Sequence, residues 1–369
     1  MKAFCRPRTS LALAGLLALG WQLPAGAEAE AAQQARAQRL DAIEQAARAG
    51  LEPVLASAAF YPRQRTCFSC HHQTLPMLAM VEARRAGLLA GADALDAQRE
   101  FTHAAFTDLR ERLQAGRGIG GRAMTVGYGL WALDLGAAEL DDTTETMVAY
   151  LLRTQEADGS FWRNVHRPPL EDSQFMSTVL SAYYLQLHAA PAQTDAADAA
   201  VEAAVRWLDQ AEPVSQEDHN ARMWGLRLFG AEPRPLAEAI AAVLTRQRPD
   251  GGWAQLADMD SDAYATGQTL FLLRESGLHT PSPAWQRGID WLLDQQLPDG
   301  TWHVRTRSHP VQEMFDAGFP HDKDQFISIS ATSWAAAALA AALPDRQPQN
   351  PQDSPDREPD QAVTADPSG

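Results

Sequence analysis

The sequence contains a segment that recurs three times, and such a repeat restricts the fold to architectures built from copies of one unit. In each copy a helical segment ends in glutamine, followed by an Asp-Gly pair and an aromatic residue. The copies are Gln155–Phe161, Gln247–Trp253 and Gln296–Trp302. Asp-Gly supplies a turn that tolerates positive φ, the glutamine amide can bond free backbone groups at the helix end, and the aromatic ring can fold back on the helix.

Each turn leads into a second helical segment, which carries its own repeat. Asp172-Ser173 and Asp260-Ser261 open two of these segments, and a threonine lies six residues after each aspartate. The threonines expected on second helices are Thr74, Thr125, Thr178, Thr266 and Thr332. First helices are amphipathic, whereas second helices are richer in Ala, Gly, Ser and aromatic residues. Six such pairs predict an outer ring of amphipathic helices around an inner ring of nearly apolar ones, which is a closed (α/α)6 toroid.

The two ends of the chain differ from this helical body. Residues 1–27 have a basic start, a short apolar run and the small residues Ala25-Gly26-Ala27, which is typical of a cleaved signal peptide. The apolar run is shorter than the roughly 20 residues of a membrane span, although a retained anchor is the alternative. Residues 343–369 are rich in Pro, Asp and Gln and predict a disordered tail. The toroid is therefore expected over residues 28–342 of a periplasmic or secreted protein, with no transmembrane segment in the mature chain.

The charge of the chain excludes one class of partner. The net charge is −16, and removing residues 1–27 with their three basic residues makes it −19. A chain this acidic is not expected to bind nucleic acid or an anionic membrane surface through its charge.

The repeats resemble those of squalene–hopene cyclases and protein prenyltransferases. The copy from Arg287 to Trp302 follows the family pattern of basic residue and Gly, aromatic residue and Leu, then Gln, Gly and Trp. The resemblance covers roughly residues 67–342. It implies a terpenoid-cyclase-like α/α toroid, and in this family the central cavity takes an isoprenoid ligand. Because one fold can host many activities, the resemblance does not by itself define the chemistry.

A Cys-x-x-Cys-His segment is the first candidate functional motif. Cys67, Cys70 and His71 have the spacing at which two thiols attach c-type haem and the next histidine ligates its iron. Cys5 leaves with the predicted signal peptide, so Cys67 and Cys70 are the only cysteines of the mature chain. The alternatives are a Cys67–Cys70 disulfide and a zinc site that uses both cysteines with His71 or His72.

The second candidate motif is Asp258-Met259-Asp260-Ser261-Asp262-Ala263, directly before an expected inner helix. It resembles the D-x-D-D-T-A motif of class II terpene cyclases, in which the middle aspartate is a general acid. The resemblance implies that Asp260 is catalytic, although Ser261 replaces the next aspartate of the pattern. The alternative is that Asp260 is the N-cap of the following helix.

A polar loop from Asp316 to Gln325 is the third candidate. It leads into the last expected inner helix and therefore should lie at the mouth of the toroid cavity. His321, beside Asp322 and Asp324, is a candidate for acid–base chemistry on a ligand, and solvated loop charges are the alternative.

Three functions remain open from the sequence. The first is an exported toroid with covalent haem c that performs electron transfer or redox chemistry on a hydrophobic small molecule, together with a redox partner protein. The second is a cyclase or prenyltransferase-like enzyme that uses Asp260. The third is a non-catalytic binding or scaffold toroid with a Cys67–Cys70 disulfide.

Overall fold

The computed structural model describes residues 25–163, 167–278, 282–310 and 314–346. The chain divides into two units, residues 1–41 and residues 42–369. The described part of the first unit is the beginning of helix α1 (Ala25–Phe60). Most of the predicted signal peptide, residues 1–24, and most of the predicted tail, residues 347–369, lie outside the described residues.

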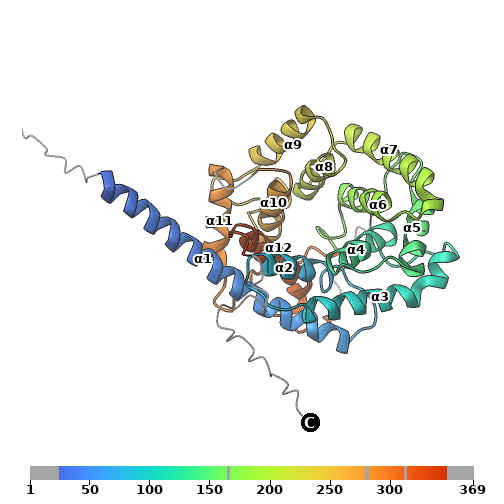
Figure 1. Cartoon of the computed structure of the whole chain (residues 1–369), viewed down its shortest axis with the longest axis horizontal. Coiled ribbons are helices and arrows are strands. Elements are labelled where there is room, and N and C mark those ends of the chain that lie inside the picture. The colour runs from blue at the N-terminus through green and yellow to red at the C-terminus, as the bar shows by residue number, and fades with distance from the viewer. Residues whose placement is uncertain (1–24, 164–166, 279–281, 311–313, 347–369) are drawn as a thin grey trace, which may run out of the picture. The chain divides into compact units, whose positions relative to one another are not determined.

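The second unit is a double ring of helices (Figure 1). The inner ring consists of α2 (Thr74–Arg85), α4 (Arg122–Leu135), α6 (Gln174–His188), α8 (Gln216–Leu228), α10 (Ala263–Glu275) and α12 (Gln325–Ala341). The outer helices are the part of α1 within this unit (residues 42–60), α3 (Asp93–Gln114), α5 (Asp142–Thr154), α7 (Thr194–Gln210), α9 (Pro233–Thr245) and α11 (Pro283–Gln295). Each inner helix packs against the next, and α12 packs against α2, so that the ring closes. The predicted α/α toroid is confirmed.

The burial pattern explains why the helices sort into two rings. Every residue of α12 except Phe326 is buried, and α10 is buried from Ala263 to Leu273. In α11, by contrast, the buried residues lie along one stripe, as expected for a helix with solvent on its other side. Short 3-10 turns lie at Tyr61–Arg63, Pro191–Gln193 and Asp322–Asp324. Within the described part of the chain, the β-structure consists of one isolated bridge between Gln155 and Phe161.

The repeated glutamines connect neighbouring outer helices. Gln155 donates from Nε2 to the carbonyl of Gly159 in its own turn, at 2.9 Å, and to the carbonyl of Ala200 in α7, at 2.8 Å. Gln247 makes the same pair of bonds to Gly251 and to Ala284 at the start of α11. Each copy therefore links one helical hairpin to the next.

The third copy closes the ring. Gln296 donates to the carbonyl of Gly300 at 2.8 Å and to the carbonyl of Ala46 in α1 at 2.9 Å. The last outer helix is thus tied to the first, over 250 residues of sequence. The sequence predicted that each glutamine bonds groups at its own helix end, and the structure adds the bond to the following helix.

The repeated threonines hold the aromatic residues of the turns. The Oγ1 atoms of Thr178, Thr266 and Thr332 accept hydrogen bonds from the backbone N–H groups of Phe161, Trp253 and Trp302. The two tryptophans also fold back on their own outer helices, because their indole N–H groups donate to the carbonyls of Val243 and Leu292. All five predicted threonines lie on inner helices, as expected.

The turns require glycine at a fixed position. Gly159, Gly251 and Gly300 have φ values of 94°, 94° and 82°. A Cβ on Gly300 would also lie 2.2 Å from the carbonyl oxygen of Ala49 in α1. Positive φ and close backbone approach both exclude larger residues there.

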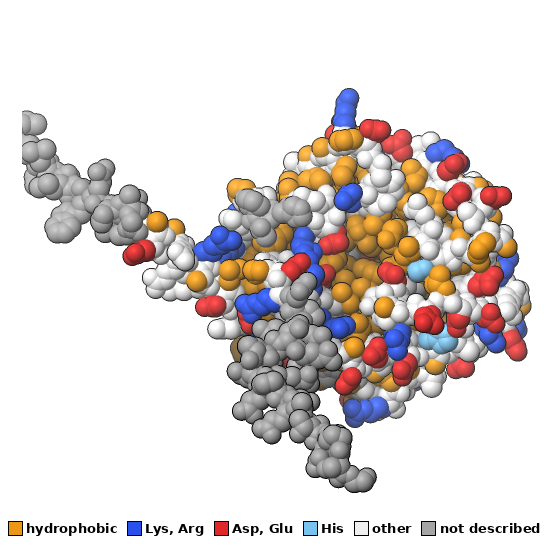
Figure 2. Space-filling view, in the orientation of Figure 1, with side chains coloured by type: hydrophobic (Ala, Val, Ile, Leu, Met, Phe, Trp, Pro, Cys, Tyr) orange, Lys and Arg blue, Asp and Glu red, His pale blue; other side chains and the backbone are white. Residues whose placement is uncertain are grey.

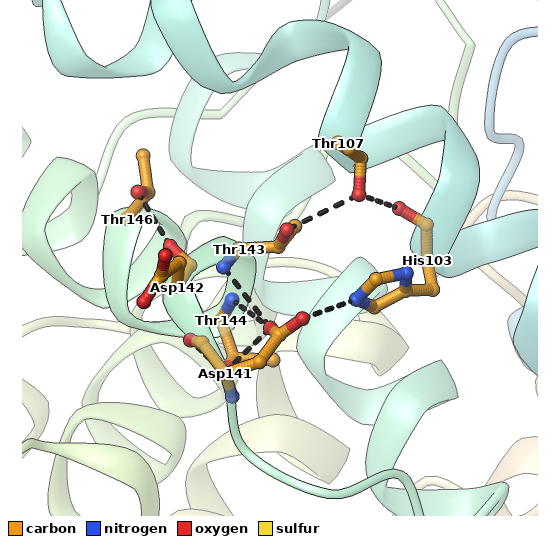
Figure 3. Close-up of polar contacts among 7 residues, drawn as sticks. All are labelled: His103, Thr107, Asp141, Asp142, Thr143, Thr144 and Thr146. Atoms are coloured by element: carbon orange, nitrogen blue, oxygen red, sulfur yellow. Dashed lines mark hydrogen bonds and ion pairs between the residues drawn. The ribbon is translucent and has the colours of Figure 1, made fainter.

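A polar cluster fastens α3 to the start of α5 (Figure 3). Asp141 is the N-cap of α5 and accepts from the backbone N–H groups of Thr143 and Thr144. Its second oxygen lies 2.6 Å from Nε2 of His103 on α3. Burial alone would raise the pKa of Asp141, but the Thr144 N–H and His103 lower it overall. His103 therefore joins α3 to the N-terminus of α5 through the Asp141 carboxylate.

Figure 2 shows one face of the protein, on which hydrophobic side chains gather over the middle of the ring and charged side chains occupy its periphery. Across the described ranges, no helix combines the length and the apolar character needed to span a membrane.

The ring-closing glutamine gives a stability prediction. Gln296→Ala removes the two hydrogen bonds to the carbonyls of Ala46 and Gly300, which should lower the free energy of unfolding by about 2 kcal/mol, about 1 kcal/mol for each bond. Urea unfolding followed by circular dichroism measures this change. The control is Gln295→Ala at the neighbouring exposed position. Equal stability of the two variants would contradict the proposed closing role.

Candidate functional site

A cavity of about 1000 Å³ opens at the N-terminal ends of several inner helices. Its walls come from the segment before α2, the last turns of α3, the start of α4, the loop before α6, and the loop before α12 with the start of that helix. Helix N-termini present free N–H groups and partial positive charge. The cavity volume lies at the upper end of the range for small-molecule and cofactor sites, about 300–1000 Å³.

All three residues of the Cys-x-x-Cys-His motif line this cavity. Both thiols are free in the structure; Cys67 is exposed and Cys70 is buried. The Tyr61 hydroxyl lies 3.5 Å from Sγ of Cys67. Burial raises the pKa of Cys70, with a further contribution from the Glu171 carboxylate, so this thiol keeps its proton at neutral pH. The two cysteines therefore differ in reactivity.

His71 enters the cavity as a neutral imidazole. Its ring packs edge-on against Phe326, with centroids 5.7 Å apart, and its Nδ1 lies 2.7 Å from Oγ of Ser69. Burial lowers the pKa of His71 well below its ordinary value, and the neighbouring His72 and Arg167 lower it further. A neutral imidazole has a lone pair available for a metal ion.

His72 also lines the cavity and is only 1% exposed. Its ring stacks on Tyr61, with centroids 4.6 Å apart. Neither of its ring nitrogens has a hydrogen-bond partner. Burial lowers the pKa of His72 to about 3, so the side chain is neutral.

The cavity is basic although the chain is acidic. Arg65, Arg112, Arg167 and Lys323 line it, whereas Glu171 is the one acid among the described residues of its wall. The net charge of the whole chain is −16. The Arg65 guanidinium lies 3.9 Å from the centre of the Phe315 ring, and Arg112 donates to the Gly118 carbonyl at 2.7 Å. The cavity therefore favours a ligand with negatively charged groups.

The remaining wall is largely apolar. Phe68, Leu109, Ile119, Phe315 and Phe326 contribute aromatic and aliphatic surface. Met314 also lines the cavity and is 59% exposed. The combination of apolar walls with cationic groups suits an amphiphilic ligand.

Asp260 lies outside the cavity wall and is exposed. The prediction that Asp260 caps the next helix is wrong, because the N-cap of α10 is Asp262, whose Oδ1 accepts from the Ala265 N–H at 3.0 Å. The Asp262 Oδ2 atom is buried without a partner. Burial raises the pKa of Asp262 to about 6, against the opposing hydrogen bond from Ala265.

His321 also lies outside the cavity wall, although the neighbouring Lys323 and Gln325 line it. The His321 Nε2 atom lies 2.8 Å from Oγ1 of Thr301, and its ring stacks on His303 with centroids 4.7 Å apart. Burial and the proximity of His303 lower its pKa. The structure therefore places this histidine against the last repeat turn.

Sequence reasoning did not single out a buried acid at the start of α8. Glu217 is 3% exposed, and the Tyr264 hydroxyl on α10 donates to its Oε2 at 3.2 Å. Burial raises the pKa of Glu217 well above its ordinary value, and the neighbouring Asp218 raises it further. Glu217 is therefore a buried acid within the ring whose environment favours its protonated form, although it does not line the cavity. No local sequence signal distinguishes it from a surface glutamate.

The tryptophans on inner helices form a packed cluster. Trp131 lies 5.4 Å from Trp224 and 6.1 Å from Trp334, measured between ring centroids. All three are buried.

The described residues contain no group of three or more His, Cys, Asp or Glu side chains arranged to hold a metal ion. The zinc alternative therefore has no assembled ligand set in this structure. Haem attachment does not require the three side chains to surround one point. The two thiols bond two different carbon atoms of the porphyrin, and the imidazole binds the iron.

Comparison with known proteins supports the fold. No family model and no curated protein sequence matches the chain. A variant of the type II terpene cyclase MstE from Scytonema, in complex with geranylgeranyl dihydroxybenzoate, is similar with a TM-score of 0.50 and 16% identity, over 83% of this chain and 99% of that chain. A wild-type glycosidase is similar with a TM-score of 0.51 and 13% identity, over the same shares. One fold thus carries a cyclase and a glycosidase, so the likeness establishes the architecture and leaves the chemistry open.

The unequal environments of the cysteines give a prediction. In the reduced chain without a cofactor, an alkylating reagent should modify Cys67 roughly tenfold or more faster than Cys70, because Cys70 is buried and keeps its proton. Peptide mass spectrometry after timed quenching measures both rates. In denaturant the two rates should converge. Equal rates in the folded protein would contradict the described site.

Proposed function

We propose that this protein is a redox protein with covalently bound haem c, built on a terpene-cyclase-like α/α toroid. One observation carries the proposal: Cys67, Cys70 and His71 all line the same cavity of about 1000 Å³. A motif of this kind in a packed core would leave no room for a porphyrin. The cavity provides space, apolar walls and a neutral imidazole.

Attachment requires two reduced thiols. Each S–H adds across one vinyl double bond, so that the sulfur bonds one vinyl carbon, the hydrogen goes to the other, and no external oxidant is needed. Exposed Cys67 and buried Cys70 would supply the two thiols, and His71, which follows Cys70 in the chain, would hold the iron. Once bound, the haem would supply a one-electron couple at its iron.

The basic wall suits the remaining groups of the cofactor. Haem has two propionate carboxylates, and the cavity has four cationic side chains from separate segments of the chain. Arg112 and Arg167 are held by the Gly118 carbonyl and the Glu171 carboxylate. These groups would neutralise the propionates, while the aromatic wall limits water at the porphyrin face and tunes its potential. The space beside the cofactor would then accept a hydrophobic ligand, and electrons would pass to or from a partner protein.

Expression with the c-type maturation machinery tests the proposal. The mature chain should show a c-type absorption spectrum and keep its haem on a denaturing gel. Cys67→Ser combined with Cys70→Ser should remove the cofactor, and His71→Ala should keep it attached but change its visible spectrum. His321→Ala, outside the cavity, is the matched control and should retain the wild-type spectrum. Absence of haem from the wild-type chain, in a host that matures another c-type cytochrome, would refute the proposal.

A second candidate function is acid-catalysed cyclisation of an isoprenoid. It is favoured by the similar structure of MstE, which binds geranylgeranyl dihydroxybenzoate. The exposed position of Asp260 does not favour that residue as the acid. Incubation with geranylgeranyl dihydroxybenzoate should give an isomeric cyclic product if the chain is a cyclase, and this product should be lost in Asp260→Asn but kept in Asp258→Asn, its exposed neighbour, only if Asp260 is the acid. Turnover that survives in Asp260→Asn would exclude Asp260, and no product from the wild-type chain would exclude this substrate.

A further inference from the structure

The mouth of the cavity is positive, whereas the chain as a whole is negative. Three cationic side chains of the wall are exposed, namely Arg65, Arg112 and Lys323, and they come from three separate segments. Arg167 is half-buried and pairs with Glu171, the one acid among the described wall residues. At an ionic strength of about 0.1 M, charges more than about 10 Å away are largely screened. A molecule that approaches the mouth therefore meets these cations rather than the net charge of −16.

Two of the exposed cations are grouped with apolar side chains at the rim. The Arg65 guanidinium lies 3.9 Å from the centre of the Phe315 ring. Met314, the residue before Phe315, lines the same cavity and is 59% exposed. The side-chain amide of Gln325 donates to the Phe315 carbonyl, which closes the loop that carries Lys323. We call Arg65, Met314, Phe315 and Lys323 the rim cluster.

The acidic side chains of this loop are not part of the cavity wall. Asp316, Asp322 and Asp324 all lie outside it. Asp316 accepts from the Gly318 N–H in its own turn at 2.8 Å, and Asp324 is buried with one oxygen 2.8 Å from Nε2 of His303. The charges that line the mouth itself are therefore those of the cations.

The rim cluster also has the composition of a protein interface. Arginine, methionine and aromatic residues are enriched in such interfaces. An arginine that stacks on an aromatic ring presents charge and apolar area on one surface. Exposed Cys67 lines the same cavity, so a cofactor bonded to it would be attached beside this surface.

We propose that the rim cluster docks the acidic surface of a protein redox partner. This inference rests on the proposed haem function and identifies the partner by its charge. Opposite charges steer two proteins together and raise their association rate. A small contact area lets the complex separate quickly, as electron-transfer encounters require. The complex therefore weakens as salt is added.

The first experiment measures the charge of the mouth without haem. The reduced full chain, produced without maturation machinery, is treated with iodoacetate, an anion, or with iodoacetamide, its neutral amide, and peptide mass spectrometry gives the modification rates of Cys67. The ratio of the iodoacetate rate to the iodoacetamide rate should rise roughly twofold as the ionic strength falls from about 1 M to about 0.1 M. Arg65→Gln and Lys323→Gln should each reduce this rise. Arg234→Gln removes the same charge from an exposed position on α9 and should keep it.

The second experiment uses the mature protein with an acidic flavodoxin as the probe. One electron passes from the flavodoxin hydroquinone to the ferric haem, which leaves a flavin semiquinone and ferrous haem. The second-order rate constant should rise roughly tenfold as the ionic strength falls from about 1 M to about 0.1 M. Arg65→Gln and Lys323→Gln should each flatten this dependence, and Arg234→Gln should preserve it.

Two results would overturn the docking proposal while leaving the haem function intact. The first is an alkylation ratio that falls as salt is removed, as the net charge of −16 alone would dictate. The second is a mature haem protein whose rate constant with flavodoxin is constant or falls as salt is removed. A wild-type chain that acquires no haem would refute the proposed function and the redox docking together.

Discussion

The structure depends on a small unit in which one glutamine amide satisfies two carbonyl groups. The first carbonyl belongs to the tight turn after the outer helix, and the second belongs to the next outer helix. A hydrogen bond of this kind contributes about 0.5–1.5 kcal/mol net, so a single side chain that makes two of them stabilises both the turn and the joint between hairpins. In the last copy, Gln296 reaches Ala46 in α1, and the same interaction that spaces the hairpins also closes the ring.

The closed ring determines where a ligand site can form. The threonine of each inner helix holds the backbone of the preceding turn, which fixes the inner helices relative to the outer ones. Segments that lead into α2, α4, α6 and α12 then meet at one end of the ring, around a cavity of about 1000 Å³. Helix N-termini and four cationic side chains make this a positive site in an acidic protein. The Cys-x-x-Cys-His motif lies in its wall, which is the basis of the proposed haem function.

The elements that the sequence predicted well are those whose physics is local. The Asp-Gly turns, the aromatic that folds back and the inner threonines recur at fixed spacing, and each contact spans few residues. The sequence left Asp260 as either a general acid or the N-cap of the following helix, and the structure gives the cap to Asp262 instead. The choice depends on the path of the chain after the turn, where the Asp262 N–H donates to the Trp253 carbonyl.

The candidate site was predicted only in part for a different reason. Cys67, Cys70 and His71 are adjacent in sequence, so their spacing was visible. The cations of the cavity wall come from the segment between the Tyr61–Arg63 turn and α2, from α3, from the loop before α6 and from the turn before α12, and no local pattern marks Arg112 or Arg167 as neighbours. No local pattern shows either that His321 lies outside the cavity. Its sequence neighbours Lys323 and Gln325 line the cavity, whereas the His321 ring packs against Thr301. Convergence of distant segments is a property of the closed ring.

The mass of the intact, denatured chain tests the central claim most directly, because it depends on neither colour nor activity. The chain should be expressed with its own N-terminus in a host that matures c-type cytochromes. The account predicts a mature polypeptide heavier by one covalently bound haem. A polypeptide mass without haem, or one lighter by the two hydrogens lost in forming a Cys67–Cys70 disulfide, would contradict it.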